Sequence, residues 1–404
     1  MSRLHDLIDE LCPDGVTFLT LSELFNTRNG YTPSKSNKEF WENGTVPWFR
    51  MEDIRENGNI LSDSLQHVSE KAVKGNLFPA NSIIVATSAT IGQHALITVK
   101  SLANQRFTYL MLKEQYKDKF DIKFLYYYCF KLDNYCLSCL NQSSFASVDM
   151  GKFSKFEFPL VPLEVQREIV RILDNFTELT TELTMELTAR QKQYSYYRNH
   201  LLSFNSEIPF VKLGDFCDLL TGFPFDSSQF VNQGICLMRG MNIKRGILEF
   251  NDDIDRYWEN SNGLERFLLE DGDIVISMDG SLVGKSYGMV RQDNLPLLLV
   301  QRVTRIRTEK ANIRYVYHYI ASGSFTCYVE KKKTGGAIPH ISLKDIANFS
   351  IPLPELDVQN RLVDILDNFD AICSDLNIGL PAEIEARTKQ YEYYRDKLLT
   401  FKEK

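Results

Sequence analysis

The chain of 404 residues carries the same helical framework twice, and this repeat limits its possible folds more than any other feature. The segment VQREIVRILDNF at residues 165–176 returns as VQNRLVDILDNF at residues 358–369, with 8 of 12 positions identical. A second segment, ARQKQYSYYRNHLLSF at residues 189–204, returns as ARTKQYEYYRDKLLTF at residues 386–401, with 11 of 16 identical. Two ordered matches of this length indicate a duplicated scaffold whose halves fold alike.

The long blocks before each framework copy also correspond, though more faintly. WFRMEDI aligns with LMRGMNI, which sets Arg50 opposite Arg239, and NSIIVATSATIGQ aligns with GDIVISMDGSLVGK. Short apolar runs such as SIIVAT, HALITV, DIVISM and LLLVQRVTRI are typical of strands. The aromatic-rich runs IKFLYYYCFKLDNYCLSCL and IRYVYHYIASGSFTCYV predict core helices. We therefore expect two α+β domains that have diverged from one ancestor.

Both framework copies show apolar residues three and four positions apart, the spacing of a helix seam. In the first copy the seam residues are Ile169, Ile172, Phe176, Leu179 and Leu183 and, after a slip of four positions, Leu187, Tyr194, Tyr197, Leu201 and Phe204. In the second copy they include Ile365, Phe369, Tyr391, Tyr394 and Leu398. Gly379 and Pro381 interrupt the second copy, so we expect a kink or a short loop there, with Pro381 opening a new helix. The tyrosines are interpreted as coiled-coil core, with docking of a partner helix as the alternative.

These patterns predict an α+β chain with a pseudo-twofold internal repeat, in which two mixed domains alternate with long helices that pair as an antiparallel coiled coil. We expect a first domain with an N-terminal helix at residues 1–158 and a central spacer helix at residues 159–208. A second domain is expected at residues 209–350, and a C-terminal spacer helix at residues 351–404.

Composition favours a folded protein of the cytoplasm. Hydrophobic residues make up 44% of the chain, enough to fill cores, and no apolar run approaches the roughly 18 residues needed to span a bilayer. The eight cysteines are scattered, which suits a reducing compartment, and the lone pair Cys136 and Cys139 is interpreted as helix core. The net charge of −7 argues at first against nucleic acid, but the blocks at residues 18–158 and 210–350 are close to neutral.

A search for catalytic motifs yields one near-miss. Gly280, Gly284, Lys285 and Ser286 follow a strand-like run and nearly spell a phosphate-binding loop, but three residues rather than four separate the first glycine from the Gly-Lys pair. The aligned turn of the first block carries Gln93 in place of the lysine. A single Asp-x-Lys at Asp121 is interpreted as surface charge. We expect no catalytic residue and no metal site in this chain.

The framework segments, with their KQYxYYRxxLLxF endings, resemble the conserved regions of type I restriction–modification specificity subunits. The resemblance covers the whole chain and implies two target recognition domains, each reading one half of a split site in double-stranded DNA. It further implies antiparallel helices that separate these domains and dock two methyltransferase subunits. S-adenosylmethionine, ATP and Mg²⁺ would then belong to the methyltransferase and to a restriction (motor) subunit, and this chain would hold no cofactor.

Base reading uses donors and acceptors of basic and amide side chains, with further cations on phosphates. The candidates in the first block are Arg28, Lys35, Lys38, Arg50, Gln93, His94, Gln142 and Ser143. Those in the second block are Arg239, Lys244, Arg245, Lys285, Lys331, Lys332, Lys333 and His340. Two other readings stay open: a duplicated coiled-coil adaptor that binds protein only, and an enzyme such as an ATPase.

Overall fold

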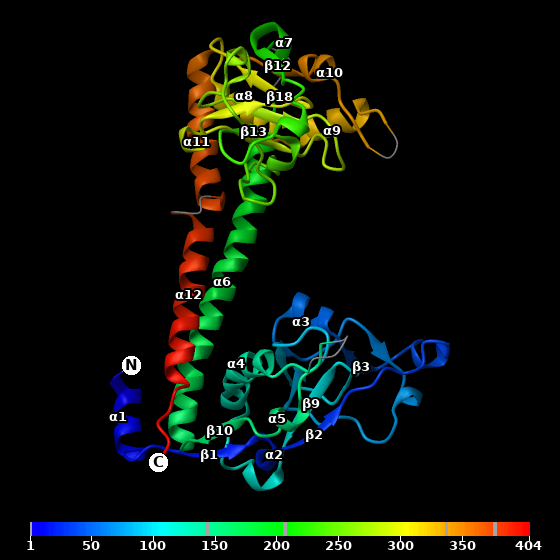
Figure 1. Cartoon of the computed structure of the whole chain (residues 1–404), viewed down its shortest axis with the longest axis vertical. Helices are drawn as coiled ribbons and strands as arrows, with labels where there is room; N and C mark the ends of the chain where they lie inside the picture. The colour runs from blue at the N-terminus through cyan, green and yellow to red at the C-terminus, as the bar shows by residue number, and fades with distance from the viewer. Residues whose placement is uncertain (1, 142–145, 205–207, 336–337, 375–377) are drawn as a thin grey trace. The chain divides into compact units, whose positions relative to one another are not determined.

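The computed structural model describes residues 2–141, 146–204, 208–335, 338–374 and 378–404 (Figure 1). The chain divides into two compact units. The first unit consists of Met1–Glu182 together with Glu385–Lys404, and the second of Leu183–Ile384. The C-terminal residues therefore fold with the N-terminal half, and each unit contains parts of both framework copies.

The first unit contains a five-stranded sheet of order β2-β9-β6-β7-β4, a three-stranded sheet of order β5-β3-β8, and the antiparallel pair β1-β10. Its strands are β1 (Thr17–Thr20), β2 (Phe25–Asn29), β3 (Val46–Phe49), β4 (Ile60–Leu61), β5 (His67–Val68), β6 (Ser82–Ala86), β7 (His94–Ile97), β8 (Leu102–Ala103), β9 (Phe107–Leu112) and β10 (Glu157–Leu160). Its helices are α1 (Ser2–Leu11), α2 (Leu21–Leu24), α3 (Met51–Asn57), α4 (Ile122–Ser138) and α5 (Met150–Phe153).

The second unit repeats this plan with a four-stranded sheet of order β12-β18-β15-β16, a three-stranded sheet of order β14-β13-β17, and the pair β11-β19. Its strands are β11 (Phe210–Lys212), β12 (Asp218–Thr221), β13 (Ile235–Met238), β14 (Tyr257–Trp258), β15 (Ile274–Ser277), β16 (Tyr287–Met289), β17 (Leu297–Leu299), β18 (Val303–Arg307) and β19 (Ser350–Pro352). Its short helices are α7 (Leu213–Phe216), α8 (Ile313–Ile320), α9 (Gly323–Lys332) and α10 (Leu343–Ala347).

The two sheets of each unit correspond strand by strand. β3 pairs with β5 antiparallel and with β8 parallel, and β13 pairs with β14 and β17 in the same two senses. The first unit adds β4, which pairs parallel with β7. The predicted duplication of the α+β blocks is therefore confirmed at the level of topology.

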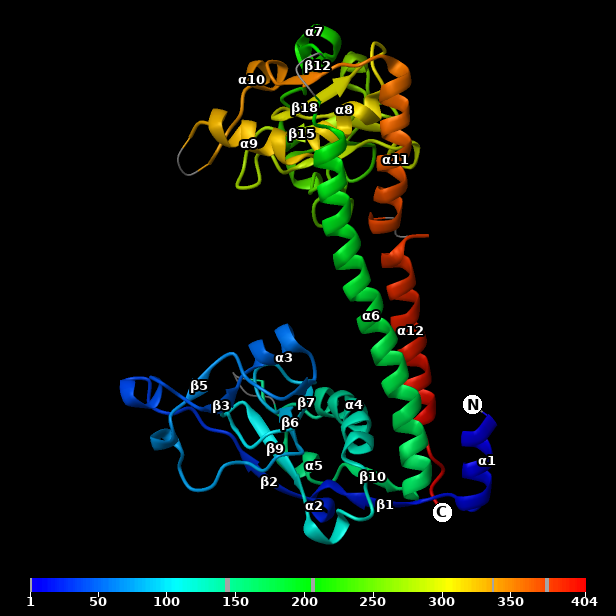
Figure 2. The same cartoon turned by 180° about the vertical axis from the view of Figure 1, so that it is seen from behind.

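The framework forms the long helices α6 (Leu163–Leu201), α11 (Leu356–Ser374) and α12 (Leu380–Leu398). The 39 residues of α6 run without interruption through the slip in the heptad pattern. Pro381 is the second residue of α12, as expected, because proline lacks only a donor that the first turn does not use. In the first unit, α1 lies on the side of α6 opposite the sheets in both views (Figures 1 and 2).

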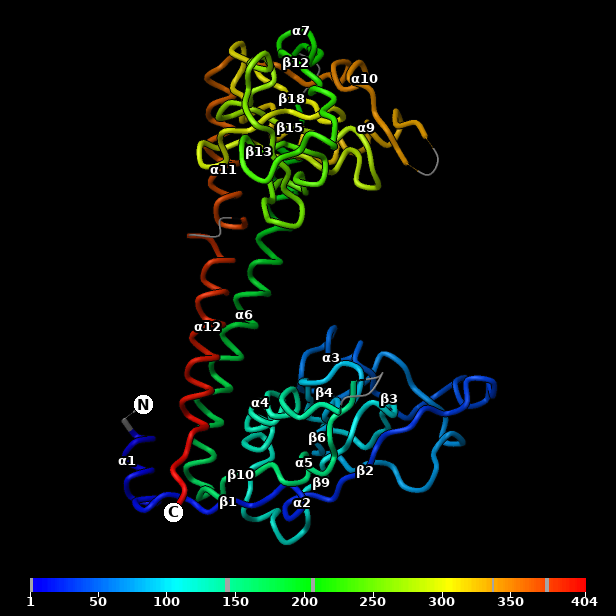
Figure 3. Tube along the Cα trace, in the orientation of Figure 1, coloured from blue at the N-terminus to red at the C-terminus, as the bar shows by residue number. Residues whose placement is uncertain are grey.

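Two expectations need correction in detail. The run LLLVQRVTRI is not one strand, because the chain turns at Arg302, whose φ is +66°, and so β17 and β18 belong to different sheets. The second aromatic run is also interrupted. α8 ends at Ile320 and α9 begins at Gly323, whereas the first run forms the single helix α4 (Figure 3). Both aromatic runs are otherwise core helices, as predicted, with Tyr127 and Tyr315 almost fully buried.

Candidate nucleic-acid interface and helix seams

An aromatic cluster stands at the equivalent point of each helix pair. In the first unit, the ring of Phe176 lies 6.5 Å from Tyr391 and 5.7 Å from Tyr394, centroid to centroid. In the second unit, the ring of Phe369 lies 6.4 Å from Tyr194 and 5.6 Å from Tyr197. The phenylalanine of each LDNF segment thus packs on the tyrosines contributed by the other framework copy. The predicted seam residues meet, and the helices pair antiparallel.

The rest of the predicted seam is less uniform. Ile169 and Leu398 are buried, and Ile172 and Leu201 are half-buried. Ile365 departs from the expectation, since 44% of it is exposed. Its neighbour Leu366 is fully buried, because α11 turns that side toward the core of the second unit.

An aspartate shared by both framework copies anchors a helix of each domain. In the first unit, Asp174 of α6 accepts a hydrogen bond from the hydroxyl of Tyr127 at 2.7 Å, and its second oxygen lies 2.7 Å from Nζ of Lys123. Both partners lie on α4, whose N-terminal cap is Asp121. The Asp-x-Lys of the sequence is therefore a helix cap followed by an anchoring cation.

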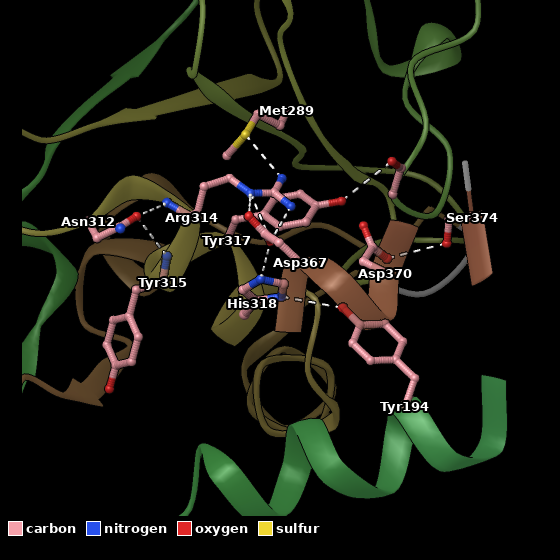
Figure 4. Close-up of polar contacts among 11 residues, drawn as sticks. Tyr194, Met289, Asn312, Arg314, Tyr315, Tyr317, His318, Asp367, Asp370 and Ser374 are labelled. Atoms are coloured by element: carbon pink, nitrogen blue, oxygen red, sulfur yellow. Dashed lines mark hydrogen bonds and ion pairs between the residues drawn. The ribbon is translucent and has the colours of Figure 1, made fainter. Parts of the chain in front are cut away.

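In the second unit the equivalent Asp367 binds Arg314 and His318, both on α8 (Figure 4). Nε2 of His318 lies 2.7 Å from the carboxylate, and Nδ1 lies 3.4 Å from the hydroxyl of Tyr194 on α6. Despite its own desolvation, the hydrogen bonds from His318 and Arg314 lower the pKa of Asp367 to about 2. Burial lowers the pKa of His318, so a neutral imidazole donates to Asp367 and accepts from Tyr194.

A buried glutamine makes the second shared contact. Oε1 of Gln166 accepts from the backbone N–H of Asp121 at 2.8 Å, and Oε1 of Gln359 accepts from that of Asn312 at 2.9 Å. Each donor residue, Asp121 or Asn312, is the N-terminal cap of the domain helix, α4 or α8. Neither glutamine is among the residues predicted to be functional, although their identity in both copies, among apolar neighbours, was a usable signal.

The near phosphate loop is a turn whose donors bind within the protein. The N–H of Gly280 donates to the carbonyl of Pro339, and those of Lys285 and Ser286 donate to the carbonyl of Leu282. In the first unit the aligned turn makes the equivalent contact, from the N–H of Ala89 to the carbonyl of Ala146. These backbone donors are already satisfied, so the segment is not arranged to cradle phosphate.

Close packing explains the glycine that both turns share. Gly284 has a φ of +78°, and a Cβ on it would lie 2.7 Å from side-chain atoms of Val329 on α9. Gly92 has a φ of +85°, and its Cβ would lie 3.0 Å from Leu137 on α4. Each turn therefore rests on the C-terminal part of the aromatic-rich helical run of its own domain, and glycine is required for both conformation and space.

In the second unit the structure brings several predicted cations together. Lys285, in the turn, and Lys333 both contribute to a lowered pKa of Glu330, chiefly through the hydrogen bond from Lys333. Lys331 and Lys332 are exposed in the last turn of α9. His340 is held beside them, because its N–H and carbonyl both bond to Thr334. We call Lys285, Lys331, Lys332, Lys333 and His340 the α9 cluster.

Arg50 and Arg239, aligned in the sequence, occupy equivalent positions. Each precedes a short helical turn, and its backbone N–H donates to the side chain three residues later, Asp53 or Asn242. The guanidinium of Arg239 contacts the carbonyl of Ile254 at 3.3 Å, which ties it to its own domain. Lys244 and Arg245 are exposed in the following loop.

The first-unit candidates are not gathered in this way. Arg28 stacks on Phe78 at 4.0 Å and donates to the carbonyl of Asn76. Lys35 is exposed in the loop after β2, Lys38 is exposed at the start of a 3-10 helix (Lys38–Phe40), and Gln93 is half-buried beside Gly92. Gln142 and Ser143 lie outside the described residues.

His94 was predicted as a DNA contact, and this prediction is wrong because the residue lies in the core. Its side chain is fully buried, and Nδ1 lies 2.6 Å from the carboxylate of Asp133. Its ring also packs on those of Tyr126 and Phe130. The strand residue after the turn points inward, which the sequence pattern alone did not reveal.

Three further observations concern chemistry. Each of the eight cysteines, all within described segments, is a free thiol, and burial raises the pKa of Cys136 to about 12. Across the described ranges, His, Cys, Asp and Glu form no group of three or more that could hold a metal ion. No helix in the part of the chain that the structure describes is long and apolar enough to cross a bilayer.

Comparisons with known proteins agree with this duplicated architecture. The sequence model of the type I restriction modification DNA specificity domain matches twice, at residues 13–190 and 205–386. The EcoprrI type I restriction enzyme specificity subunit of Escherichia coli is 41% identical over 395 residues, covering 93% of this chain and 92% of that protein. The EcoR124I/EcoR124II specificity subunit of Escherichia coli is 34% identical over 250 residues, covering 60% of this chain and 61% of that protein.

The fold of this chain resembles those of solved structures. A chain from a structure of type I restriction–modification assembly and conformational transition aligns with a TM-score of 0.64 at 17% identity, covering 96% of this chain and 98% of that one. The specificity subunit from M. genitalium aligns with a TM-score of 0.51 at 16% identity, covering 95% and 94%. With two family domains spanning most of its length and a relative matched nearly end to end, the chain belongs to the type I restriction–modification DNA specificity family.

Proposed function

We propose that this chain reads a two-part DNA sequence for a type I restriction–modification complex, and that it carries no catalytic residue itself. Residues 1–158 and 209–350 are the two target recognition domains, each reading one half-site. Residues 159–208 and 351–404 are the spacer and docking helices. The match of the specificity-family model to both halves of the chain supports this assignment.

One observation carries the proposal: the framework is kept in both copies while the side chains on the domain turns differ. Asp174 and Asp367 anchor their domains in the same way, and Gly92 and Gly284 shape the same turn. At the next position the turn presents Gln93 in one domain and Lys285 in the other. A fixed frame with different donors at one place suits two readers of different half-sites.

The α9 cluster is the leading candidate for DNA contact in the second domain. Its lysines extend from the last turn of a helix into the adjoining loop, where ammonium groups can reach phosphates. In the first domain, Lys35, Lys38 and Gln93 stay candidates because they are at least partly exposed. Arg28, Arg50 and Arg239 are secondary candidates, since each already contacts its own domain.

The chemistry of modification and cleavage would reside in partners. Two methyltransferase subunits docked on the helices would supply adenine methylation with S-adenosylmethionine. A restriction subunit would supply ATP- and Mg²⁺-dependent cleavage. The complex would act in the cytoplasm, where its DNA lies.

Sequencing of methylated DNA tests the proposal. Cells lacking other methyltransferases would express this chain with its partner methyltransferase, and modified adenines would be mapped genome-wide. We expect a split motif, with two specified parts separated by unread base pairs. A single unbroken motif, or methylation without sequence preference, would contradict it. Salt-sensitive, sequence-selective duplex binding by the same complex separates this function from that of an adaptor that binds protein only.

A further inference from the structure

Two exposed apolar side chains stand among the cations of the α9 cluster in the second unit. Ile338 is 68% exposed, the highest value among the large hydrophobic residues that the structure describes in residues 1–158 and 209–350. Leu282, in the turn that carries Lys285, is 50% exposed. Single apolar residues are common on protein surfaces, but two of them gathered among lysines mark a surface that a partner covers.

Backbone hydrogen bonds join the two segments that carry these side chains. The N–H of Gly280 donates to the carbonyl of Pro339 at 3.1 Å, and the N–H of Ile341 donates to the carbonyl of Met278 at 2.9 Å. Ile338 directly precedes the first of these acceptors, and the turn with Leu282 follows the first donor. The exposed apolar side chains therefore belong to one surface, although their segments are distant in the sequence.

The segment that carries Ile338 is closed at its base. Thr334 and His340 each donate a backbone N–H to the carbonyl of the other at 2.8 Å. Gly335 has a φ of +93°, and a Cβ on it would lie 2.6 Å from the carbonyl oxygen of Ile338. Glycine is therefore required there, and this close approach of two backbones holds Ile338 in place. Figures 1 and 2 show α9, which leads into this segment, extending away from the sheets of its unit.

The surroundings of Ile338 carry positive charge. Residues 279–286 and 330–340 contain four lysines against two acids, Asp279 and Glu330, for a net charge of +2 (4 − 2). Both carboxylates already have a cationic partner within 3.5 Å. Such flanks attract a polyanion, whereas the apolar side chain needs an apolar contact. Duplex DNA offers both, with phosphates on its outside and apolar base faces in its stack.

The sequence of the first domain has a bulky apolar residue at the matching point. In both turns a backbone N–H donates to the residue that follows this point, Ala146 in the first domain and Pro339 in the second. The residue before the acceptor is Phe145 in one domain and Ile338 in the other. Phe145 lies outside the described residues and is not part of the proposed site.

We propose that Ile338 is a wedge that enters the base stack of the DNA at the second half-site and opens one base step, while the lysines of the α9 cluster hold the flanking phosphates. Leu282 supplies a second apolar contact beside it. The inference rests on the proposed function. It adds a contribution to specificity that needs no hydrogen bond to a base, because the cost of opening a step depends on its sequence and is lowest at pyrimidine–purine steps.

Fluorescence energy transfer along the target duplex tests the wedge. The probe is a synthetic duplex of the site found by methylation mapping, with a dye at each end, bound by the assembled complex. An inserted apolar side chain kinks a duplex by roughly 20–90°, so the wild type should bring the dyes closer together than Ile338→Ala does. Ile338→Ala should also bind about tenfold more weakly, because it buries less apolar surface. Its dependence on salt should be unchanged, because no cation is removed.

Three variants serve as controls. Ile338→Met keeps a long apolar side chain and should retain the kink. Phe210→Ala removes an apolar side chain that is 63% exposed on β11, in a separate sheet pair of the same unit, and should alter neither the kink nor the affinity. Lys331→Gln should reduce the dependence of binding on salt, which Ile338→Ala does not. Thermal unfolding of each complex checks that the second unit is folded.

The contrary outcomes are distinct. Equal energy transfer with the wild type and with Ile338→Ala would overturn the wedge and leave the proposed function intact. A loss of affinity in Ile338→Ala that comes with a smaller dependence on salt would also overturn it, since the effect would then act through phosphates. Release of the methyltransferase from the Ile338→Ala chain would make a protein the occupant of this surface. A wild-type complex that does not prefer the target over an unrelated duplex would instead count against the proposed function.

Discussion

Nε2 of His318 lies 2.7 Å from the carboxylate of Asp367, and the imidazole between Asp367 and Tyr194 is fully shielded from solvent. In the first unit the equivalent aspartate is Asp174, which accepts a hydrogen bond from the hydroxyl of Tyr127 at 2.7 Å. The two units thus share the anchor but differ in its partner, a phenol in the first unit and an imidazole, whose unperturbed pKa is about 6.5, in the second. The two units should therefore respond differently to mild acid.

The first prediction is a pH dependence of the second unit. Burial lowers the pKa of His318, so the unfolded chain takes up a proton near pH 6.5 that the folded unit does not bind. Stability from this group is present above about pH 6.5 and falls with decreasing pH, by at most about 1.4 kcal/mol per pH unit. Calorimetry between pH 7.5 and 5 should show this slope for the second unit. His318→Gln, which keeps a donor for Asp367, should flatten it, and an unchanged slope would contradict a neutral buried His318.

The second prediction concerns the turn at Gly284. Gly284→Ala should destabilise the second unit by about 2 kcal/mol or more, through left-handed strain and overlap with Val329. Gly280→Ala is the matched control, because its φ is +95° but a Cβ there meets nothing within 4 Å. Adding Val329→Ala to Gly284→Ala should restore only the share of the lost stability that comes from overlap with Val329, and not the share that comes from backbone strain. Equal losses at Gly280 and Gly284, measured by urea unfolding, would mean that packing on α9 plays no part.

A third prediction tests the α9 cluster on DNA. In the assembled complex, replacing Lys285, Lys331 and Lys332 with glutamine should weaken binding and make it less sensitive to salt. The slope of log K against log salt should shrink by roughly 0.9 for each phosphate that the variant no longer neutralises. Lys192→Gln, an exposed charge on α6 outside both domains, serves as control. If Lys285→Gln alone leaves affinity and half-site choice untouched, Lys285 has no reading role.

A fourth prediction concerns spacing and uses a repeat inside α6. Residues 177–188 read TELT, TELT and MELT, and the hydroxyls of Thr177, Thr181 and Thr188 each bond to the carbonyl four residues earlier. Deleting residues 181–184 removes one unit, or about 6 Å of helix. Methylation mapping should then show the same half-sites with the unread gap altered by about one or two base pairs. Thr181→Ala preserves the length of α6 and should leave the unread gap unchanged. If the deletion changes the sequence of a half-site instead of the gap, the length of α6 does not set the spacing.

The sequence predicted the repeated elements well, because periodicity and turn chemistry are local. The pairing of Phe176 with Tyr391 and of Phe369 with Tyr194 could be expected once both copies were aligned. The sequence did not show which side chains other elements would bury. His94 points inward because of the strand register and because it contacts Asp133 of α4, which is 39 residues away in the sequence.

The exposure of Ile365 likewise depends on something outside its own segment. Its equivalent Ile172 packs against the core cluster that contains Leu4 of α1, and the described part of the second unit has no helix equivalent to α1. The anchors Asp174 and Asp367 were visible as identical polar residues within the repeat, but their partners on α4 and α8 required the fold. A pattern within one helix specifies which side is apolar, and the tertiary partner decides whether that side is covered.

Independent reading by the two domains is the central claim, and a domain exchange tests it most directly. Residues 18–158 would be replaced with the corresponding segment of a relative that recognises another site, and modified adenines would be mapped in cells carrying the exchanged chain and the methyltransferase. We predict that one half of the motif changes to that of the relative, while the other half and the length of the unread gap stay the same. A change in both halves, or in neither, would contradict the account.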